Sequence, residues 1–120
     1  MSNSIDFTTF DYFSPGYNNV TVSGETTIVS TKAQTAGTYV ILAIGSMSSS
    51  DQTFITWTLK QNGTQIAQTF SDPVARAHAI IITQAILNQN DIITLTVDGT
   101  GTTLTRPNGI LLLKVGNATS

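Results

Sequence analysis

The fold of this chain is decided by the stretch Ala79-Ile80-Ile81-Ile82-Thr83-Gln84-Ala85-Ile86-Leu87. In an extended strand successive side chains point to opposite faces, so one face carries Ile81, Ala85 and Leu87 and the other carries Ile80, Ile82 and Ile86. A strand of a small antiparallel sandwich normally has one apolar and one polar face, because one side meets water. Both faces are apolar here, so the strand needs two partners. One is the core of its own domain, and we expect the other to be a second copy of the chain.

The remaining strands predicted from the sequence are of two kinds. Residues 38–44 and 110–115 are again apolar on both faces, whereas residues 53–60 and 91–98 alternate. In the alternating stretches the inward side is predicted to carry Ile55, Trp57, Leu59, Ile93, Leu95 and Val97, and the outward side Thr56, Thr58 and Lys60. The chain shows no helical period. Many short strands of this kind predict an all-β fold, a two-sheet antiparallel jelly-roll sandwich.

Two connections are predicted from their turn residues. Asn62-Gly63 indicates a tight hairpin, because both residues tolerate a positive φ. Residues 45–50 are rich in Ser and Gly, which is typical of a loop.

The second apolar face predicts self-association. If about six large aliphatic side chains each lose roughly 100 Å² of exposed surface, their burial contributes about 15 kcal/mol per subunit before association costs. Soluble monomers rarely expose an apolar patch of that size. Closed symmetry is the ordinary way to hide such a face, and we predict a homotrimer.

Composition narrows the possible partners. The chain has 120 residues, enough for one domain with its own core, and no Cys, which excludes disulfides and thiolate metal sites. Charged residues make up 10% of the chain and the formal net charge is −2, which argues against a nucleic-acid partner. No stretch approaches the ~20 apolar residues of a membrane span, so no membrane partner is expected. The N-terminus lacks the basic and apolar segments of a signal peptide, so we expect synthesis in a cytoplasm.

A search for catalytic residues finds no convincing set. His78 is the only histidine, which leaves no His pair for a metal and no Cys-His couple. No Gly-x-Ser-x-Gly motif occurs. The seven acidic residues are dispersed at turns, where Asp commonly caps backbone amides; calcium at Asp91 or Asp98 is an alternative. We therefore predict no enzymatic activity, no cofactor and no metal site.

The chain is predicted to have three parts: an N-terminal aromatic-rich arm (1–24), a jelly-roll domain (25–116) and a C-terminal tail (117–120). The arm carries five of the nine aromatic residues, namely Phe7, Phe10, Tyr12, Phe13 and Tyr17. One interpretation is a first strand whose rings cover the end of the sandwich. The other is an arm that docks on a partner, because large rings dominate interface energetics.

Four motifs in order carry a resemblance to a known family. They are Gly37-Thr38-Tyr39-Val40, Leu59-Lys60-Gln61-Asn62-Gly63-Thr64, Leu87-Asn88-Gln89-Asn90-Asp91-Ile92-Ile93-Thr94-Leu95 and Asn108-Gly109-Ile110-Leu111. Together they resemble the tumour necrosis factor-like jelly roll, and they are similar in style to complement globular heads and to small versions in bacteriophage virions. The resemblance covers roughly residues 25–116 and implies a tight homotrimer formed through the inner sheet.

The resemblance also implies roles for single residues. The Tyr of the Gly-x-Tyr element points into the sandwich, which places Tyr39, Ile41 and Ala43 in the core. The implied trimer interface consists of Val40, Leu42, Ile44, Ile80, Ile82, Gln84, Leu111 and Leu113. Lys114 would then share the parity of core positions, which puts the end of the last strand in doubt. The N-terminal arm has no counterpart in the family core.

Two functions are compatible with these features. The leading hypothesis is a virion structural protein, made in the host cytoplasm: a trimeric decoration or cement protein that stabilises the outer surface of a bacteriophage capsid. Its partners would be itself and the major capsid protein, which the arm would contact through Phe7, Phe10, Tyr12, Phe13 and Tyr17. The alternative is a receptor- or carbohydrate-binding head of a phage fibre or spike, with residues 46–52 and 69–76 as binding loops. A cytokine-like or complement-like soluble ligand ranks third, and a metabolic enzyme last.

Overall fold

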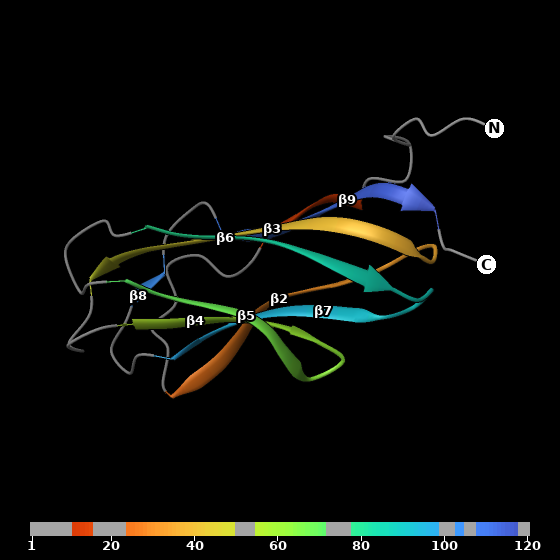
Figure 1. Cartoon of the computed structure of the whole chain (residues 1–120). Helices are drawn as coiled ribbons and strands as arrows, with labels where there is room; N and C mark the ends of the chain where they lie inside the picture. Colours follow the sequence, from red (N-terminus) through yellow and green to blue (C-terminus); the bar gives the residue numbers. More distant parts are fainter. Residues whose placement is uncertain are drawn as a thin grey trace.

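The computed structural model describes residues 11–15, 24–49, 55–71, 78–98, 103–104 and 108–117. These residues form strands joined by turns (Figure 1). The strands are β1 (Asp11–Pro15), β2 (Glu25–Lys32), β3 (Gly37–Ser49), β4 (Ile55–Gln61), β5 (Thr64–Ser71), β6 (His78–Leu87), β7 (Ile92–Asp98), β8 (Thr103–Leu104) and β9 (Gly109–Asn117). None of these described segments is an apolar helix of the length that a membrane crossing requires.

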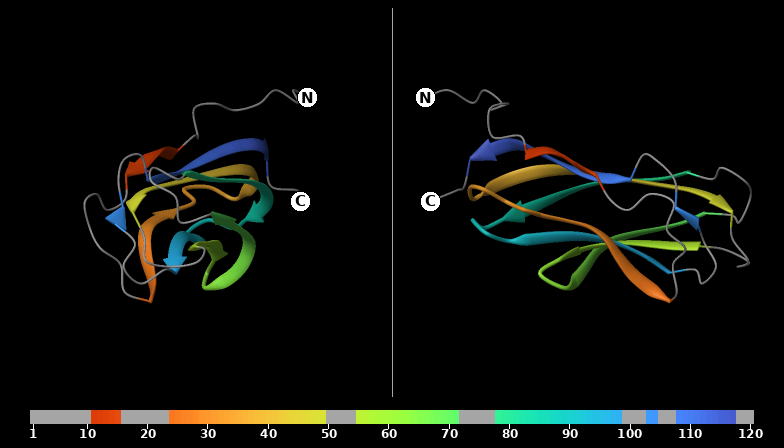
Figure 2. Two further views of the ribbon diagram at one scale, coloured as in Figure 1. Left: turned by 90° about the vertical axis from the view of Figure 1, so that its left-hand side faces the viewer. Right: turned by 180° about the vertical axis from the view of Figure 1, so that it is seen from behind.

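The strands form two antiparallel sheets that face each other (Figure 2). The first sheet has the order β1-β9-β3-β6, with β8 paired to the far part of β3. The second sheet has the order β2-β7-β4-β5. The three doubly apolar stretches are β3, β6 and β9, and all of them lie in the first sheet. This arrangement confirms the predicted all-β, two-sheet jelly-roll sandwich.

The core lies between the sheets and takes side chains from the inward face of each. Its buried apolar residues are Ile28, Val29, Ala33, Tyr39, Ile41, Ala43, Ile55, Trp57, Leu59, Ala79, Ile81, Leu87, Ile93, Leu95, Val97, Ile110 and Leu112. Tyr39, Ile41 and Ala43 are each at most 1% exposed, as the resemblance implied. The inward residues predicted for β4 and β7 are buried too. The backbone of a strand directs alternate side chains to opposite faces, so the apolar face of each strand could be read from its sequence.

The predicted loop at residues 45–50 is wrong over most of its length, because β3 continues to Ser49. Gly45 and Ser46 still pair with β6, and the strand beyond them pairs with β8. The backbone N–H of Ser46 also donates to Oδ1 of Asn108 at 3.0 Å. Cross-strand partners therefore override the loop preference of Ser and Gly.

The doubt about the last strand is resolved by Lys114. β9 runs on to Asn117, and the side chain of Lys114 is directed inward and only 7% exposed. Its Nζ donates to Oγ1 of Thr35 at 3.1 Å, while the hydroxyl of Tyr39 donates to the carbonyl oxygen of Thr35 at 2.7 Å. The ammonium is therefore held in a polar corner at the end of the core, beside a bulge opposite Thr38 and Tyr39.

The hairpin predicted at Asn62-Gly63 is confirmed. Asn62 has φ 51° and Gly63 has φ 85°, and the two residues connect β4 to β5. Asn90, in the turn before β7, also has a positive φ of 74°. Asn and Gly are the residues that accept this backbone conformation most readily.

Part of the predicted N-terminal arm belongs to the first sheet. β1 pairs with β9 through Asp11 opposite Leu112, Ser14 opposite Ile110 and Pro15 opposite Gly109, with an irregularity after Asp11. β1 is thus a short edge strand, a position that tolerates Pro because one side of the strand has no ladder to maintain.

Candidate functional site

The outward aliphatic side chains of β3, β6 and β9, together with Gln84 among them, form a surface that we call the outer apolar face. It consists of Val40, Leu42, Ile44, Ile80, Ile82, Gln84, Ile86, Leu111 and Leu113. The strand register arranges these residues in rows. Leu42 lies opposite Ile82 on one side and Leu111 on the other, and in the next row Val40 lies opposite Gln84 and Leu113.

Exposure of the outer apolar face is highest on β6. Ile80, Ile82 and Ile86 are 60%, 69% and 73% exposed, whereas the members on β3 and β9 are partly buried by their neighbours within the sheet. All eight residues of the predicted trimer interface lie on this face. Their role in an interface stays a prediction. Ile86 lies on the same face, and its parity with Ile80 and Ile82 in the sequence already indicated this position.

The outer apolar face has no charged member. Lys114 is the only Lys, Arg, Asp or Glu in β3, β6 and β9, and its side chain points to the core side. Because side chains alternate between the two faces of a strand, the charge of Lys114 lies on the core side and not on the outer apolar face. Covering this face desolvates no charged side chain, so another apolar surface can bury it.

The energy available from covering β6 is considerable. Full burial of one Ile contributes about 1.5–3 kcal/mol, so three Ile residues exposed by roughly two-thirds offer about 3–6 kcal/mol. The partly buried aliphatic side chains on β3 and β9 add a smaller gain. The face is therefore suited to association with a flat apolar partner.

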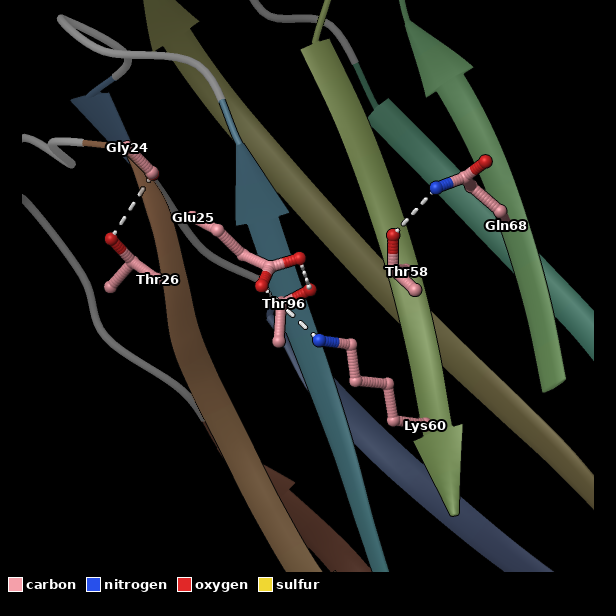
Figure 3. Close-up of polar contacts among 7 residues, drawn as sticks. All are labelled: Gly24, Glu25, Thr26, Thr58, Lys60, Gln68 and Thr96. Carbon is pink, nitrogen blue, oxygen red and sulfur yellow. Dashed lines mark hydrogen bonds and ion pairs between the residues drawn. The ribbon is translucent and has the colours of Figure 1, made fainter. Parts of the chain in front are cut away.

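The outer face of the second sheet is chemically different, and Figure 3 shows its polar contacts. Nζ of Lys60 lies 3.1 Å from Oε1 of Glu25, and Oγ1 of Thr96 donates to the other carboxylate oxygen at 3.4 Å. Nε2 of Gln68 donates to Oγ1 of Thr58 at 2.9 Å, across the β4-β5 pair. Thr58 was predicted to face outward, and it is nonetheless only 4% exposed on this side of the sheet. The two sheets thus present one apolar and one polar surface.

Asp91 joins three turns at one end of the sandwich. Oδ1 of Asp91 accepts from Nδ2 of Asn62 at 2.9 Å. Oδ2 accepts from Nε2 of Gln61 at 3.0 Å and from the backbone N–H of Asn88 at 2.8 Å. The carbonyl oxygen of Asp91 accepts from the N–H of Ala33 at 2.9 Å, which brings in the β2-β3 turn.

The surroundings of Asp91 favour its carboxylate form. The hydrogen bonds from Asn62 and from the backbone of Asn88 lower the pKa of Asp91 below its ordinary value of 3.8; Gln61 acts in the same direction and partial burial opposes them. Both oxygens of the carboxylate already accept from nitrogen donors, which is an arrangement for structural linkage rather than for a calcium ion. Among the described residues, His, Asp and Glu nowhere form a group of three or more suited to a metal.

Other predicted site residues are placed only in part. Phe7, Phe10 and Tyr17 lie outside the described residues, whereas Tyr12 and Phe13 belong to β1. Of the binding loops in the alternative hypothesis, residues 46–49 belong to β3 and residues 69–71 to β5; the rest lie outside the described part of the chain.

The fold has been seen in other proteins. The structure of murine APRIL at pH 8.5 superposes with a TM-score of 0.70 and 12% sequence identity, covering 85% of this chain and 95% of that one. Eiger, a TNF protein from S. frugiperda, superposes with a TM-score of 0.62 and 16% identity, covering 78% and 67%. A family 35 carbohydrate-binding module from an environmental isolate gives a TM-score of 0.50 and 15% identity, covering 93% of each chain.

These similarities concern the fold. No protein-family model and no curated protein matches the sequence. The chain therefore has a tumour necrosis factor-like jelly-roll fold, as its sequence motifs indicated.

Proposed function

We propose that this chain is a virion structural protein, a homotrimer that binds the outer surface of a bacteriophage capsid as a decoration or cement protein. The observation that carries the self-association is the charge-free outer apolar face, with Ile80, Ile82 and Ile86 more than half exposed. The tumour necrosis factor-like fold supports a trimer, since the family resemblance implies association through this sheet. The polar second sheet would then face outward from the trimer.

Attachment to the capsid is assigned to the aromatic arm. β1 is paired to β9, so Phe7 and Phe10 precede a strand that belongs to the sheet. Three copies in a trimer would carry three such segments. Three linked contacts give high avidity even where each contact is weak, because the second and third bind at high effective concentration. The major capsid protein is the proposed partner, and the virion exterior is the proposed location.

Sedimentation velocity at tens of micromolar protein tests the first part of this proposal, and we expect a trimer. The second part is tested by adding the protein to phage heads stripped of their decoration protein. The double variant Phe7→Ala, Phe10→Ala should remain trimeric and lose capsid binding, because the rings would supply most of the contact energy. Thr8→Ala, Thr9→Ala is the matched control and should bind as the unchanged protein does. Full binding by the Phe double variant would overturn the role of the arm.

A second candidate function is carbohydrate binding by a fibre or spike head, and the exposure of Phe70 favours it. Phe70 is 59% exposed on the polar second sheet, two residues after Gln68 on β5. An aromatic ring beside neutral amide and hydroxyl groups suits a sugar, which has an apolar ring face and hydroxyl groups at its edge. A glycan array tests this function. If the chain binds carbohydrate, the unchanged protein binds glycans on the array and Phe70→Ala does not. If it is a capsid protein only, neither the unchanged protein nor Phe70→Ala binds a glycan.

A further inference from the structure

Gln84 is the one amide side chain on the outer apolar face. It lies in the middle of β6 between Ile82 and Ile86, and it is opposite Val40 of β3. Gln84 is exposed, as are both of its isoleucine neighbours on the same face. A second copy that covers these isoleucines would therefore cover Gln84 as well.

Covering Gln84 sets a condition on how the copies meet. An amide group has two N–H donors and a carbonyl acceptor, and removing it from water without partners is unfavourable. Its direct neighbours Val40, Ile82 and Ile86 carry no hydrogen-bonding group, and Thr38, which lies opposite Ile86 in the next row, carries a single hydroxyl. One hydroxyl cannot satisfy two N–H donors and a carbonyl acceptor together. Only an arrangement that brings another polar group to Gln84 satisfies its amide, and in a symmetric assembly the Gln84 of the next copy is such a group.

We propose that Gln84 specifies the register and the number of copies in the self-assembly, by pairing its amide with those of the other copies near the symmetry axis. The inference rests on the proposed self-association and adds the residue that selects one assembly among several. An apolar face built of aliphatic residues alone permits sliding and alternative stoichiometries, because dispersion and hydrophobic contacts have little direction. A single buried amide removes the arrangements that leave it unpaired.

The absence of charge on the outer apolar face is the reason why we assign its occupant as a second copy of this chain. Near a symmetry axis every residue meets its own copy, so a charged residue there would face a like charge at short range. Lys114 is the only Lys, Arg, Asp or Glu of β3, β6 and β9, and it points inward. An amide is self-complementary, since the carbonyl oxygen of one copy accepts from the N–H of the next.

The experiment uses the full chain, analysed by native mass spectrometry and by sedimentation velocity over a hundredfold range of protein concentration. The variant Gln84→Leu removes the amide and keeps the face apolar. We expect it to associate at a lower concentration than the unchanged protein but as a mixture of stoichiometries. Gln65→Leu adds the same side chain at an exposed position of β5 and is the matched control; it should keep the single species of the unchanged protein.

A second variant, Gln84→Glu, keeps the size of the side chain and guards against failure of the Leu variant to fold. At pH 7 it places like charges together near the axis, and we expect its dissociation midpoint to rise at least tenfold in protein concentration. A single unchanged stoichiometry in Gln84→Leu, or an unchanged midpoint in Gln84→Glu, overturns the role of Gln84. A monomeric unchanged protein overturns the proposed self-association itself, and the role of Gln84 with it.

Discussion

Gly45 of β3 lies directly against the indole ring of Trp57 on the facing sheet. A Cβ atom at position 45 would overlap the ring atoms Cζ3 and Cε3 of Trp57. Trp57 is 0% exposed and is the largest fully buried side chain of the described core. The absence of a side chain at Gly45 therefore sets how closely the two sheets approach around the indole.

Replacing Gly45 with Ala should lower the free energy of unfolding by about 1–3 kcal/mol, because a well-packed core tolerates added volume poorly. The measurement is urea denaturation followed by circular dichroism, which also serves a variant without Trp57, the only tryptophan of the chain. Adding Trp57→Phe to this variant should restore part of the loss, since the smaller ring leaves room for the methyl group. Gly116→Ala is the control, because its new Cβ would lie 3.6 Å from Cβ of Thr38 in ordinary contact. Equal effects of the two glycine substitutions would contradict the packing argument.

Replacing Asp91 with Asn should lower the free energy of unfolding at pH 7 by about 1–3 kcal/mol, because donors of Asn62 and Gln61 lose a charged acceptor. Asp98→Asn, on an exposed residue of β7, is the matched control and should change stability by less than ~0.5 kcal/mol.

The contribution of Asp91 should also depend on pH. Its pKa is lowered in the folded state, so the stabilisation is fully present above the ordinary value of 3.8. It is lost as the pH falls through the lower, folded-state pKa. The stability difference between the unchanged protein and Asp91→Asn should therefore shrink on acidification below about pH 4. Denaturation curves at a series of pH values check this, and a constant difference down to pH 2 would be inconsistent with it.

Replacing Lys114 with Met should leave the free energy of unfolding unchanged or raise it. The ammonium is nearly buried, with Oγ1 of Thr35 as its described acceptor, and an apolar side chain of similar length avoids the desolvation of a charge. Lys114→Ala should instead lower stability by roughly 1–3 kcal/mol, because the stem of Lys114 packs over Gly37. Thermal and chemical denaturation of the two variants measures both effects. A Met variant as unstable as the Ala variant would show that the ammonium itself is required.

Replacing Ile82 with Asp should abolish self-association and leave the subunit folded. Ile82 is 69% exposed in the single chain, so the charge meets water there, whereas a covered face would bury it. Sedimentation velocity should show a monomer, and circular dichroism should show an unchanged β-sheet spectrum. Gln65→Asp introduces the same charge on β5 and should sediment as the unchanged protein does. If Ile82→Asp has the same sedimentation coefficient as the unchanged, self-associated protein, β6 is not part of the interface.

The faces of the strands were predictable from local sequence. Alternation alone placed Ile81 and Leu87 in the core and Ile80, Ile82 and Ile86 outside, because side chains in a strand change face at every residue. The hairpin at Asn62-Gly63 followed from the backbone preference of two adjacent residues. The order of doubly apolar and alternating stretches along the chain predicted a two-sheet sandwich with the doubly apolar strands in one sheet.

Some contacts are decided only by the tertiary structure, because they join residues that are distant in the sequence. Asp91 finds Asn62 and Gln61 about 30 positions away, and Lys114 finds Thr35 at a separation of 79 residues. The continuation of β3 through Gly45 to Ser49 likewise depends on β6, β8 and Asn108. Periodicity reports which side of a strand a residue occupies, because that is set by the backbone of the strand itself. It carries no information on which donor or acceptor another strand will bring to that side, since only the folded register determines that pairing.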